Sequence, residues 1–343
     1  MANLTLTALY TKKFFFGFLL FLGGLVVLLI FFNLGQSAMN MFFPPKPAPA
    51  LVAFGKLPKI NLDEGIKPAS DITYKIETVS GGLKELGAQL KVFAIGSPNA
   101  KFGDLEGANF RAEGLQFDIP PIGVIGGVAT YGNKRDRSKT LEIELTSGNT
   151  IINSDYLNNQ QLITSQPKDD ASSLLLTKKF LDTVGIKNIE YPSSKVEHIK
   201  YKIDDGKLTE SFSLSGANLV QVNFNRADID GVGVVYSNYR KPKIRILVSK
   251  DSVVAAKANI TKIQEFKFST YPLRGVQSAF SDLKNGGAMF NKKFDGKEFA
   301  IRDVKLAYLD TDSTQQYLQP VYVFESDEGL AAYVVAVDGT WLK

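Results

Sequence analysis

The chain has 343 residues, of which 44% are hydrophobic, and its formal net charge is +5 at pH 7. It contains no cysteine and one histidine, which excludes a disulfide framework and a thiol nucleophile and disfavours a zinc site or a serine–histidine–aspartate triad. The apolar core must therefore stabilise the fold, and a chain of this length has room for two domains.

The first predicted element is a transmembrane helix over residues 14–34. Every residue from Phe14 to Phe32 is apolar or glycine, and a helix of this length spans about 28 Å, close to the roughly 30 Å of a bilayer core. A cleaved signal peptide is the main alternative, although the best cleavage site, Gln36-Ser37-Ala38, has glutamine where a small residue is needed. A buried helix of a soluble protein is the third interpretation.

The charges that flank this helix predict its orientation. Lys12 and Lys13 lie just before it, whereas Lys46 is the first charged residue after it. Because positive residues are retained in the cytoplasm, we expect residues 1–13 to be a cytoplasmic tail and the bulk of the chain to be extracytoplasmic. A cell membrane in a bacterial envelope suits a chain without cysteine better than a eukaryotic secretory route does.

A proline-rich segment follows the predicted helix. Five prolines lie between Pro44 and Pro58, and each fixes a backbone torsion and lacks a donor. Residues 35–68 are therefore expected to form an extended, semi-rigid spacer. Its Phe42, Phe43 and Phe54 either lie at the membrane interface or pack on the folded part.

Beyond the spacer, the sequence predicts an α+β fold of two tandem extracytoplasmic modules, residues 69–190 and 191–343. Apolar and charged residues alternate in LEIEL (Leu141–Leu145) and KIRILV (Lys243–Val248), which is typical of an antiparallel sheet with one solvated face. Each module is expected to be an antiparallel sheet with one packed helix. A duplication of one unit is an alternative explanation of the repeated order.

Capping residues mark the two predicted helices. The first begins at Asp169 or Asp170 and ends at Gly185, and the second has Pro272 in its first turn and ends near Asn285. Their apolar stripes are Leu176, Phe180, Leu181 and Val184 in the first helix, and Leu273, Val276, Phe280 and Leu283 in the second.

The sequence predicts no catalytic residues, no cofactor and no metal site, so we do not expect an enzyme. The only histidine, His198, lies among alternating strand residues. Ser165 and Ser281 each begin an S-x-x-K match, but the K-T-G motif that acyl-transferases of this kind require is missing. Asp228 and Asp310 begin D-x-D pairs that lack the distal glutamate of a calcium loop, and turn carboxylates explain them better.

Basic residues cluster in two places. Lys241, Lys243 and Arg245 share one strand face, with Arg240 next to them. Either they protect an exposed sheet edge from pairing with another chain, or they contact an anionic surface such as wall polymer or lipid headgroups. Nucleic acid is not an expected partner, since aromatic residues are not interleaved with the basic ones. The second cluster is the GNKRDRSK loop, with Lys134, Arg135, Arg137 and Lys139.

The segment LQPVYVFESDEGLAAYVVAV predicts a hairpin near the carboxy terminus. Alternation places Val321 and Val323 on one face of its first strand, and Tyr322 and Phe324 on the other. A strand that is apolar on both faces is covered on both. The helix that starts near Leu273 would cover one face, and the first module or a partner protein the other. Tyr322 and Phe324 are therefore either core residues or a candidate partner surface.

The same region carries a resemblance. STYPLRGVQSAFSDLKNGG is followed by IRDVKLAYLDTDSTQQYLQPVYVFESDEGLAAYVVAVDGTW, so a helix opens after an aromatic–proline step and is followed by a strand ending in tyrosine and two apolar strands. This order resembles the terminal module of the YycI/YycH group, single-pass bacterial proteins whose PepSY-like extracytoplasmic domains regulate a membrane histidine kinase. The resemblance implies a regulatory or binding role without catalysis.

These observations lead to one expectation and one alternative. We expect a single-pass protein, held in the lipid bilayer by residues 14–34, that acts by contact with another membrane protein or with an anionic envelope polymer. The alternative is a structural envelope protein that contacts wall or surface-layer material.

Overall fold

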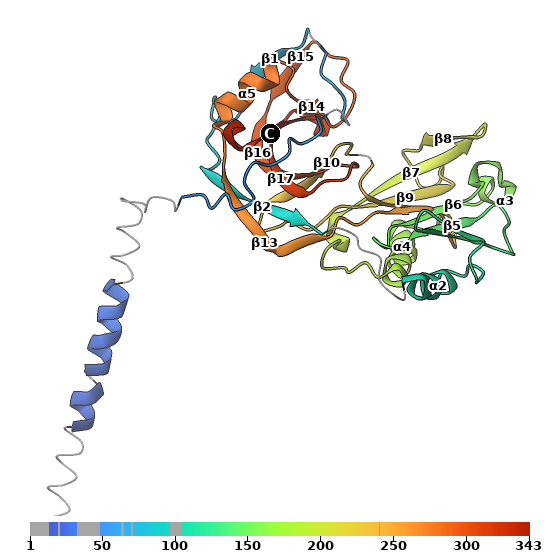
Figure 1. The fold of residues 1–343 in the computed structure, drawn as a ribbon, viewed down its shortest axis with the longest axis horizontal. Helices are drawn as coiled ribbons and strands as arrows, with labels where there is room; N and C mark the ends of the chain where they lie inside the picture. Colours follow the sequence, from blue (N-terminus) through green and yellow to red (C-terminus); the bar gives the residue numbers. More distant parts are fainter. Residues whose placement is uncertain are drawn as a thin grey trace, which may run out of the picture. The chain divides into compact units, whose positions relative to one another are not determined.

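The computed structural model describes residues 14–19, 21–32, 49–62, 65–69, 71–96, 104–239 and 241–343. The chain divides into two units, residues 1–49 and 50–343. In the first unit a helix of 19 residues covers Phe14–Phe32 (Figure 1). The predicted apolar helix is thus confirmed, and it is long and apolar enough to cross a membrane, a property that it shares with signal sequences. Lys12 and Lys13 lie outside the described residues.

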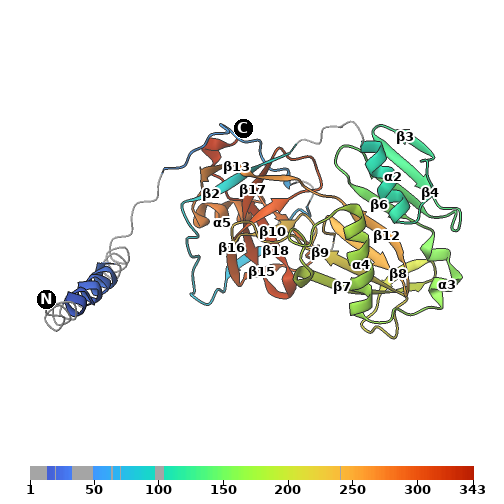
Figure 2. The same ribbon diagram turned by 90° about the horizontal axis from the view of Figure 1, so that it is seen from below.

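The middle of the chain forms a nine-stranded antiparallel sheet. The helices α2 (Asp104–Gly114) and α4 (Asp170–Val184) share one apolar cluster with one face of this sheet (Figure 2), and α3 (Gln160–Ile163) covers part of the other face. We call residues 104–258, without the strand β10 (Gly233–Tyr236), the middle lobe. In spatial order its strands are β3 (Gly123–Ile125), β4 (Val128–Gly132), β5 (Thr140–Glu144), β6 (Thr150–Asn153), β12 (Val253–Ala258), β11 (Ile244–Val248), β9 (Leu219–Phe224), β7 (Val196–Asp204) and β8 (Lys207–Glu210).

Both ends of the second unit build the other sheet. We call residues 50–96 and 259–343, together with β10, the terminal lobe. Here β10 pairs in parallel with its neighbour, whereas the remaining ladders of this sheet are antiparallel. Its helix is α5 (Val276–Lys284), and a separate parallel pair joins β1 (Thr73–Ile76) to β15 (Glu298–Ile301). After β10 the strand order is β16 (Asp303–Asp310), β17 (Tyr317–Glu325), β18 (Ala331–Val335) and β14 (Met289–Phe290), while β2 (Gln89–Ile95) pairs with β17 and with β13 (Ile263–Pro272).

The α+β class of the described chain agrees with the sequence, but the tandem order of two modules is not confirmed. The boundary predicted between residues 190 and 191 falls inside the middle lobe, because β6 pairs with β12 and α4 packs against β9 and β11. The strands β1 and β2, predicted for the first module, lie in the terminal lobe. Alternation shows which face of a strand is buried, but it does not show which strand lies beside it.

The predicted spacer is too long at its carboxy end. Leu57 is fully buried, its N–H donates to the carbonyl oxygen of Trp341 at 2.8 Å, and Ile60 is also buried. Phe54 packs against the ring of Tyr317, with 4.9 Å between the ring centroids. Residues from Ala50 onward therefore belong to the folded unit, despite the prolines among them.

The carboxy-terminal hairpin is core on both faces. Phe324 packs against Phe280 of α5, with ring centroids 6.2 Å apart, and the buried Tyr322 donates its hydroxyl proton to the carbonyl oxygen of Arg274 at 2.6 Å. On the other face, Val321 and Val323 share a buried cluster that includes Ile60. Of the two roles predicted for Tyr322 and Phe324, the structure shows the core role, and they form no exposed surface for a partner.

The two predicted helices differ in how well their starts were placed. In α4 the carboxylate of Asp169 accepts from the N–H of Ser172, and Gly185 ends the helix at φ 80°, so both predicted caps are confirmed. In α5 the predicted start is wrong, because Pro272 pairs with Gln89 in the ladder between β13 and β2. The helix begins four residues later, at Val276.

Candidate functional site at the lobe junction

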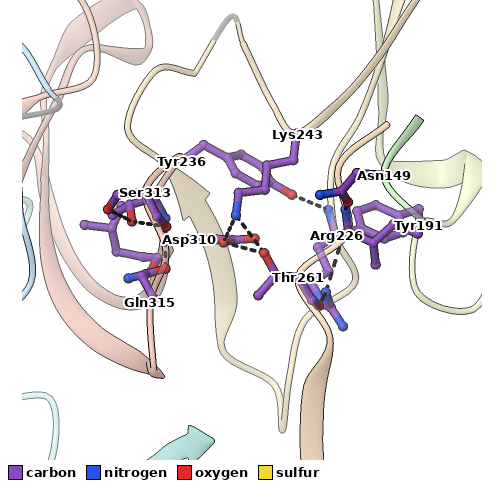
Figure 3. Close-up of polar contacts among 12 residues, drawn as sticks. Asn149, Tyr191, Arg226, Tyr236, Lys243, Thr261, Asp310, Ser313 and Gln315 are labelled. Atoms are coloured by element: carbon purple, nitrogen blue, oxygen red, sulfur yellow. Dashed lines mark hydrogen bonds and ion pairs between the residues drawn. The ribbon is translucent and has the colours of Figure 1, made fainter. Parts of the chain in front are cut away.

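A buried ion pair joins the two lobes. The Nζ atom of Lys243, just before β11, lies 2.6 Å from Oδ1 of Asp310, the last residue of β16 (Figure 3). Thr261, in the link between β12 and β13, accepts a hydrogen bond from Lys243 Nζ at 2.7 Å and donates one to Asp310 Oδ1 at 2.8 Å. The two charged side chains are only 12% and 1% exposed. Oδ2 of Asp310 is buried without a donor among the described residues, so the carboxylate can accept one further hydrogen bond.

Arg226 lies beside this pair and connects it to two tyrosines. Its Nη1 donates to the carbonyl oxygen of Thr261 at 2.8 Å and to the hydroxyl of Tyr191 at 3.4 Å, and its backbone N–H donates to the hydroxyl of Tyr236 (Figure 3). Burial raises the pKa of Tyr191 to about 12 and also raises the pKa of Tyr236. Both hydroxyls are therefore protonated at neutral pH, and the cluster contains two cations and one anion.

We predict that Lys243→Met destabilises the chain by about 3–5 kcal/mol, because it leaves the Asp310 carboxylate buried without its cation. Denaturation of the full chain in detergent, followed by the fluorescence of Trp341, measures this change. The exposed Lys241→Met is the matched control and should stay within about 0.5 kcal/mol of the parent. Equal unfolding free energies for the two variants would show that the pair does not hold the lobes together.

A cleft of about 570 Å³ lies between the lobes, next to the ion pair. Its middle-lobe wall is held by Glu144, whose Oε2 accepts from Ser147 Oγ at 2.5 Å and from Asn149 Nδ2 at 3.0 Å. Amides, hydroxyls and lysines dominate the lining, so the cleft can form many hydrogen bonds with a bound group. The terminal lobe contributes Phe54, Ile95, Lys267, Ser313, Gln315 and Tyr317.

A bulge in β13 lies at the rim of this cleft. Ile263 pairs with Ile95 and Phe268 pairs with Phe93, so the four residues 264–267 face the single residue Ala94 of β2. All four residues are exposed, and the side chain of Phe266 is exposed completely. Bulges are frequent beside functional sites, where they change the direction in which a side chain points. In this bulge Phe266 is exposed to solvent, and the following residue, Lys267, lines the cleft.

The structure corrects the predicted basic face. Lys243 is engaged in the buried ion pair, and Arg245 donates from Nη1 to the carbonyl oxygen of Pro242, while burial lowers the pKa of its guanidinium. Lys241 is exposed, and Arg240 lies outside the described residues. The idea that these residues protect a sheet edge is wrong, because β11 lies between β12 and β9. Of the residues of this face that the structure describes, only Lys241 is exposed, and a single exposed lysine makes a weak contact for an anionic surface.

The other candidate residues are not brought together. His198 lies opposite Val222 in the ladder between β7 and β9, and the hydroxyls of Ser165 and Ser281 donate to carbonyl oxygens of their own local turns. In the part of the chain that the structure describes, no three His, Cys, Asp or Glu side chains gather to hold a metal ion. Asp310 is buried and ion-paired, so its interpretation as a turn carboxylate was wrong.

Two residues of the junction, Arg226 and Thr261, were not singled out from the sequence. Arg226 follows the end of β9, and Thr261 lies between two strands. Neither position carries a periodic or motif signal, and their contacts join segments that are far apart in the chain. A charged residue two positions after the largely apolar strand β9 is the one local signal that could have suggested the buried role of Arg226.

Comparisons with known proteins give no family for this chain. No protein-family model matches the sequence, and no curated protein is significantly similar to it. A function therefore has to be inferred from the chain's own residues and their geometry.

Proposed function

We propose that this chain is a single-pass, membrane-anchored extracytoplasmic protein that binds another membrane protein at the cleft between its lobes and acts by this contact, without catalysis. One observation carries the proposal: the bulge at residues 264–267 holds Phe266 fully exposed, and its neighbour in the chain, Lys267, lines the cleft. Single exposed apolar side chains are common. Here, in addition, the ladder opens over four residues beside a polar cleft, and it presents an aromatic side chain of a type that is enriched at protein interfaces.

The anchoring part of the proposal rests on the helix Phe14–Phe32 and on the charges around it. The helix is long and apolar enough to cross a bilayer. Lys12 and Lys13 precede it, which favours a cytoplasmic amino terminus. The resemblance of the carboxy-terminal part to the YycI/YycH group supports the same topology and a regulatory role.

The chemistry of the cleft supports a protein partner. Its hydroxyl and amide groups come from both lobes, so a partner segment that enters the cleft contacts both lobes at once. Three lysines and two carboxylates, Glu144 and Asp312, line the cleft. Lys262 and Lys267 have no ion-pair partner among the described residues, so they would attract an acidic group of the partner. The alternative of a structural envelope protein has less support, because Lys243 of the basic face is used inside the fold.

Site-specific photo-crosslinking tests the proposal. With a photoreactive phenylalanine analogue in place of Phe266, we expect the full chain in its own cells to give one discrete adduct with a membrane protein. The same analogue at Phe212, which is equally exposed in the loop between β8 and β9, should give no such adduct. Lys267→Glu should weaken the adduct at position 266, since it reverses a charge of the cleft.

Three results would contradict this proposal. Identical products at positions 266 and 212 would show that Phe266 has no specific partner. An adduct with wall polymer alone would favour the structural alternative. If Lys267→Glu left the yield of the adduct unchanged, the partner at Phe266 would not be bound through the cleft.

A further inference from the structure

The outer edge of the middle lobe carries an exposed apolar segment. β3 is the terminal strand of the nine-stranded sheet, and Figure 2 shows it at the outer edge. The side chains of Ile122 and Ile125 are 75% and 85% exposed, and Ile119 and Val124 are exposed as well. No charged residue occurs from Ile119 to Tyr131. Four exposed apolar side chains thus lie within seven residues at the edge of the sheet, which is more than the scattered single residues of an ordinary surface.

A basic loop lies directly beside this segment. The N–H of Asp118 donates to the carbonyl oxygen of Gly132 at 3.0 Å, and the N–H of Lys134 donates to Asp118 Oδ2 at 2.6 Å. The start of the apolar segment is therefore hydrogen-bonded to the start of the loop of residues 133–139. Arg135 and Arg137 are exposed in this loop, as is Lys134.

The remaining charges of the loop leave a positive surface. Lys139 is turned inward and donates from Nζ to the carbonyl oxygen of Val253. Asp118 faces Lys134, with 3.8 Å between Oδ1 and Nζ, and Asp136 accepts from the N–H and the hydroxyl of Ser138. Arg135 and Arg137 have no ion-pair partner among the described residues. An apolar surface thus borders on exposed positive charge.

A partner strand is a poor occupant for this edge. Pro120 and Pro121 have no N–H to donate to a partner strand, and β3 itself has only three residues. A lipid surface needs no ladder. It takes up apolar side chains at the level of the headgroups, while lysine and arginine side chains contact anionic lipids.

We propose that residues 119–125 and the loop of residues 133–139 form a second membrane contact, specific for a bilayer with anionic lipids. Ile122 and Ile125 enter the headgroup region, and Lys134, Arg135 and Arg137 bind the anionic headgroups. The inference rests on the membrane anchor of the proposed function, because the anchor keeps the lobe near a bilayer. It is independent of the cleft and of Phe266.

A fluorescent label at a single cysteine tests the inference, since the natural chain has no cysteine. Full-length chain with Ile122→Cys, labelled with an environment-sensitive nitrobenzoxadiazole dye, is placed in nanodiscs of phosphatidylcholine alone or with phosphatidylglycerol. We expect a blue shift and an emission increase of at least twofold in the anionic discs only. The label at Phe212→Cys, which is equally accessible, should give the same spectrum in both kinds of disc.

Charge reversal separates the lipid contact from other causes. The combination Lys134→Glu, Arg135→Glu and Arg137→Glu should remove more than half of the emission increase at position 122. The control Lys178→Glu with Lys187→Glu, exposed on the same lobe, should leave it unchanged. Equal spectra at position 122 in both discs would overturn the inference. So would a spectral change that requires two chains per disc, because a second copy would then cover the edge.

Failure of the anchor can be distinguished from failure of this surface. If the chain does not enter the discs, the membrane anchor of the proposed function is wrong. The same labelled chain is then added to preformed vesicles of the two lipid compositions. A blue shift with anionic vesicles alone supports the second contact, and no shift overturns it.

Discussion

Deletion of residues 1–60 is expected to destabilise the folded unit by more than about 4 kcal/mol, whereas deletion of residues 1–49 should have almost no effect. The deleted segment contains the buried Leu57 and Ile60. Loss of a buried leucine or isoleucine side chain costs about 2–5 kcal/mol each. The N–H of Lys343 also loses its acceptor on Leu57, and the hydroxyl of Tyr271 loses its acceptor on Gly55.

The fluorescence of Trp341 measures this difference. It is the only tryptophan of the chain and packs against the cluster that contains Leu57 and Tyr271. Urea titrations of the two truncated chains should therefore differ in both midpoint and native emission. Equal midpoints would mean that residues 50–60 are a spacer after all, as the prolines of this segment predicted.

Phe324→Asp is expected to unfold the terminal lobe, with a cost of more than about 5 kcal/mol. Loss of a buried phenylalanine side chain alone costs about 3–5 kcal/mol, and the new carboxylate would be buried without a cation. Phe324 is fully buried between α5 and the sheet. Thermal unfolding of the full chain in detergent, followed by circular dichroism, measures the loss.

The exposed Phe266→Asp is the matched control, because it introduces the same side chain at the same residue type. It should leave the melting temperature nearly unchanged. A variant Phe324→Asp that kept the native melting temperature and lost a membrane complex would contradict this prediction. The hairpin would then be a partner surface, and its packing against α5 would not contribute to stability.

Local signals predicted some helices and missed others for physical reasons. The boundaries of α4 follow from Asp169 and Gly185, which act within one turn of the helix end. In α2 only Ala108 and Ala112 are buried, and its large apolar residue Phe110 is exposed. Such a helix has no apolar stripe, because its packing against α4 and β4 needs small side chains on the buried face.

The lobe junction could not be predicted, since it depends on strand neighbours. Alternation in β11 assigned Lys243 to a solvated face, and the structure places that side chain against Asp310 of the other lobe. Lys243 precedes β11 of one sheet and Asp310 ends β16 of the other, and only the complete topology brings them together. The apolar character of both faces of β17 was evident in the sequence. The residues that cover its second face, among them Ile60, were not.

The terminal lobe is built from both ends of the folded unit, and this arrangement determines the order in which the two lobes can fold. Ala94 of β2 pairs with Tyr317 of β17, about 220 positions later, so the middle lobe can complete its sheet before the terminal lobe can. The first partner of β2 is β13, whose Phe268 pairs with Phe93 and follows it by 175 positions. At the roughly 5–20 residues per second of protein synthesis, β2 waits about 9–35 s for β13 and about 10–45 s for β17. During this time β2 and the segment around Leu57 are apolar and unpaired, which makes the nascent chain prone to aggregation. Folding of the terminal lobe therefore waits for its late strands, and we expect its yield to depend on a factor that holds the early strands apart until then.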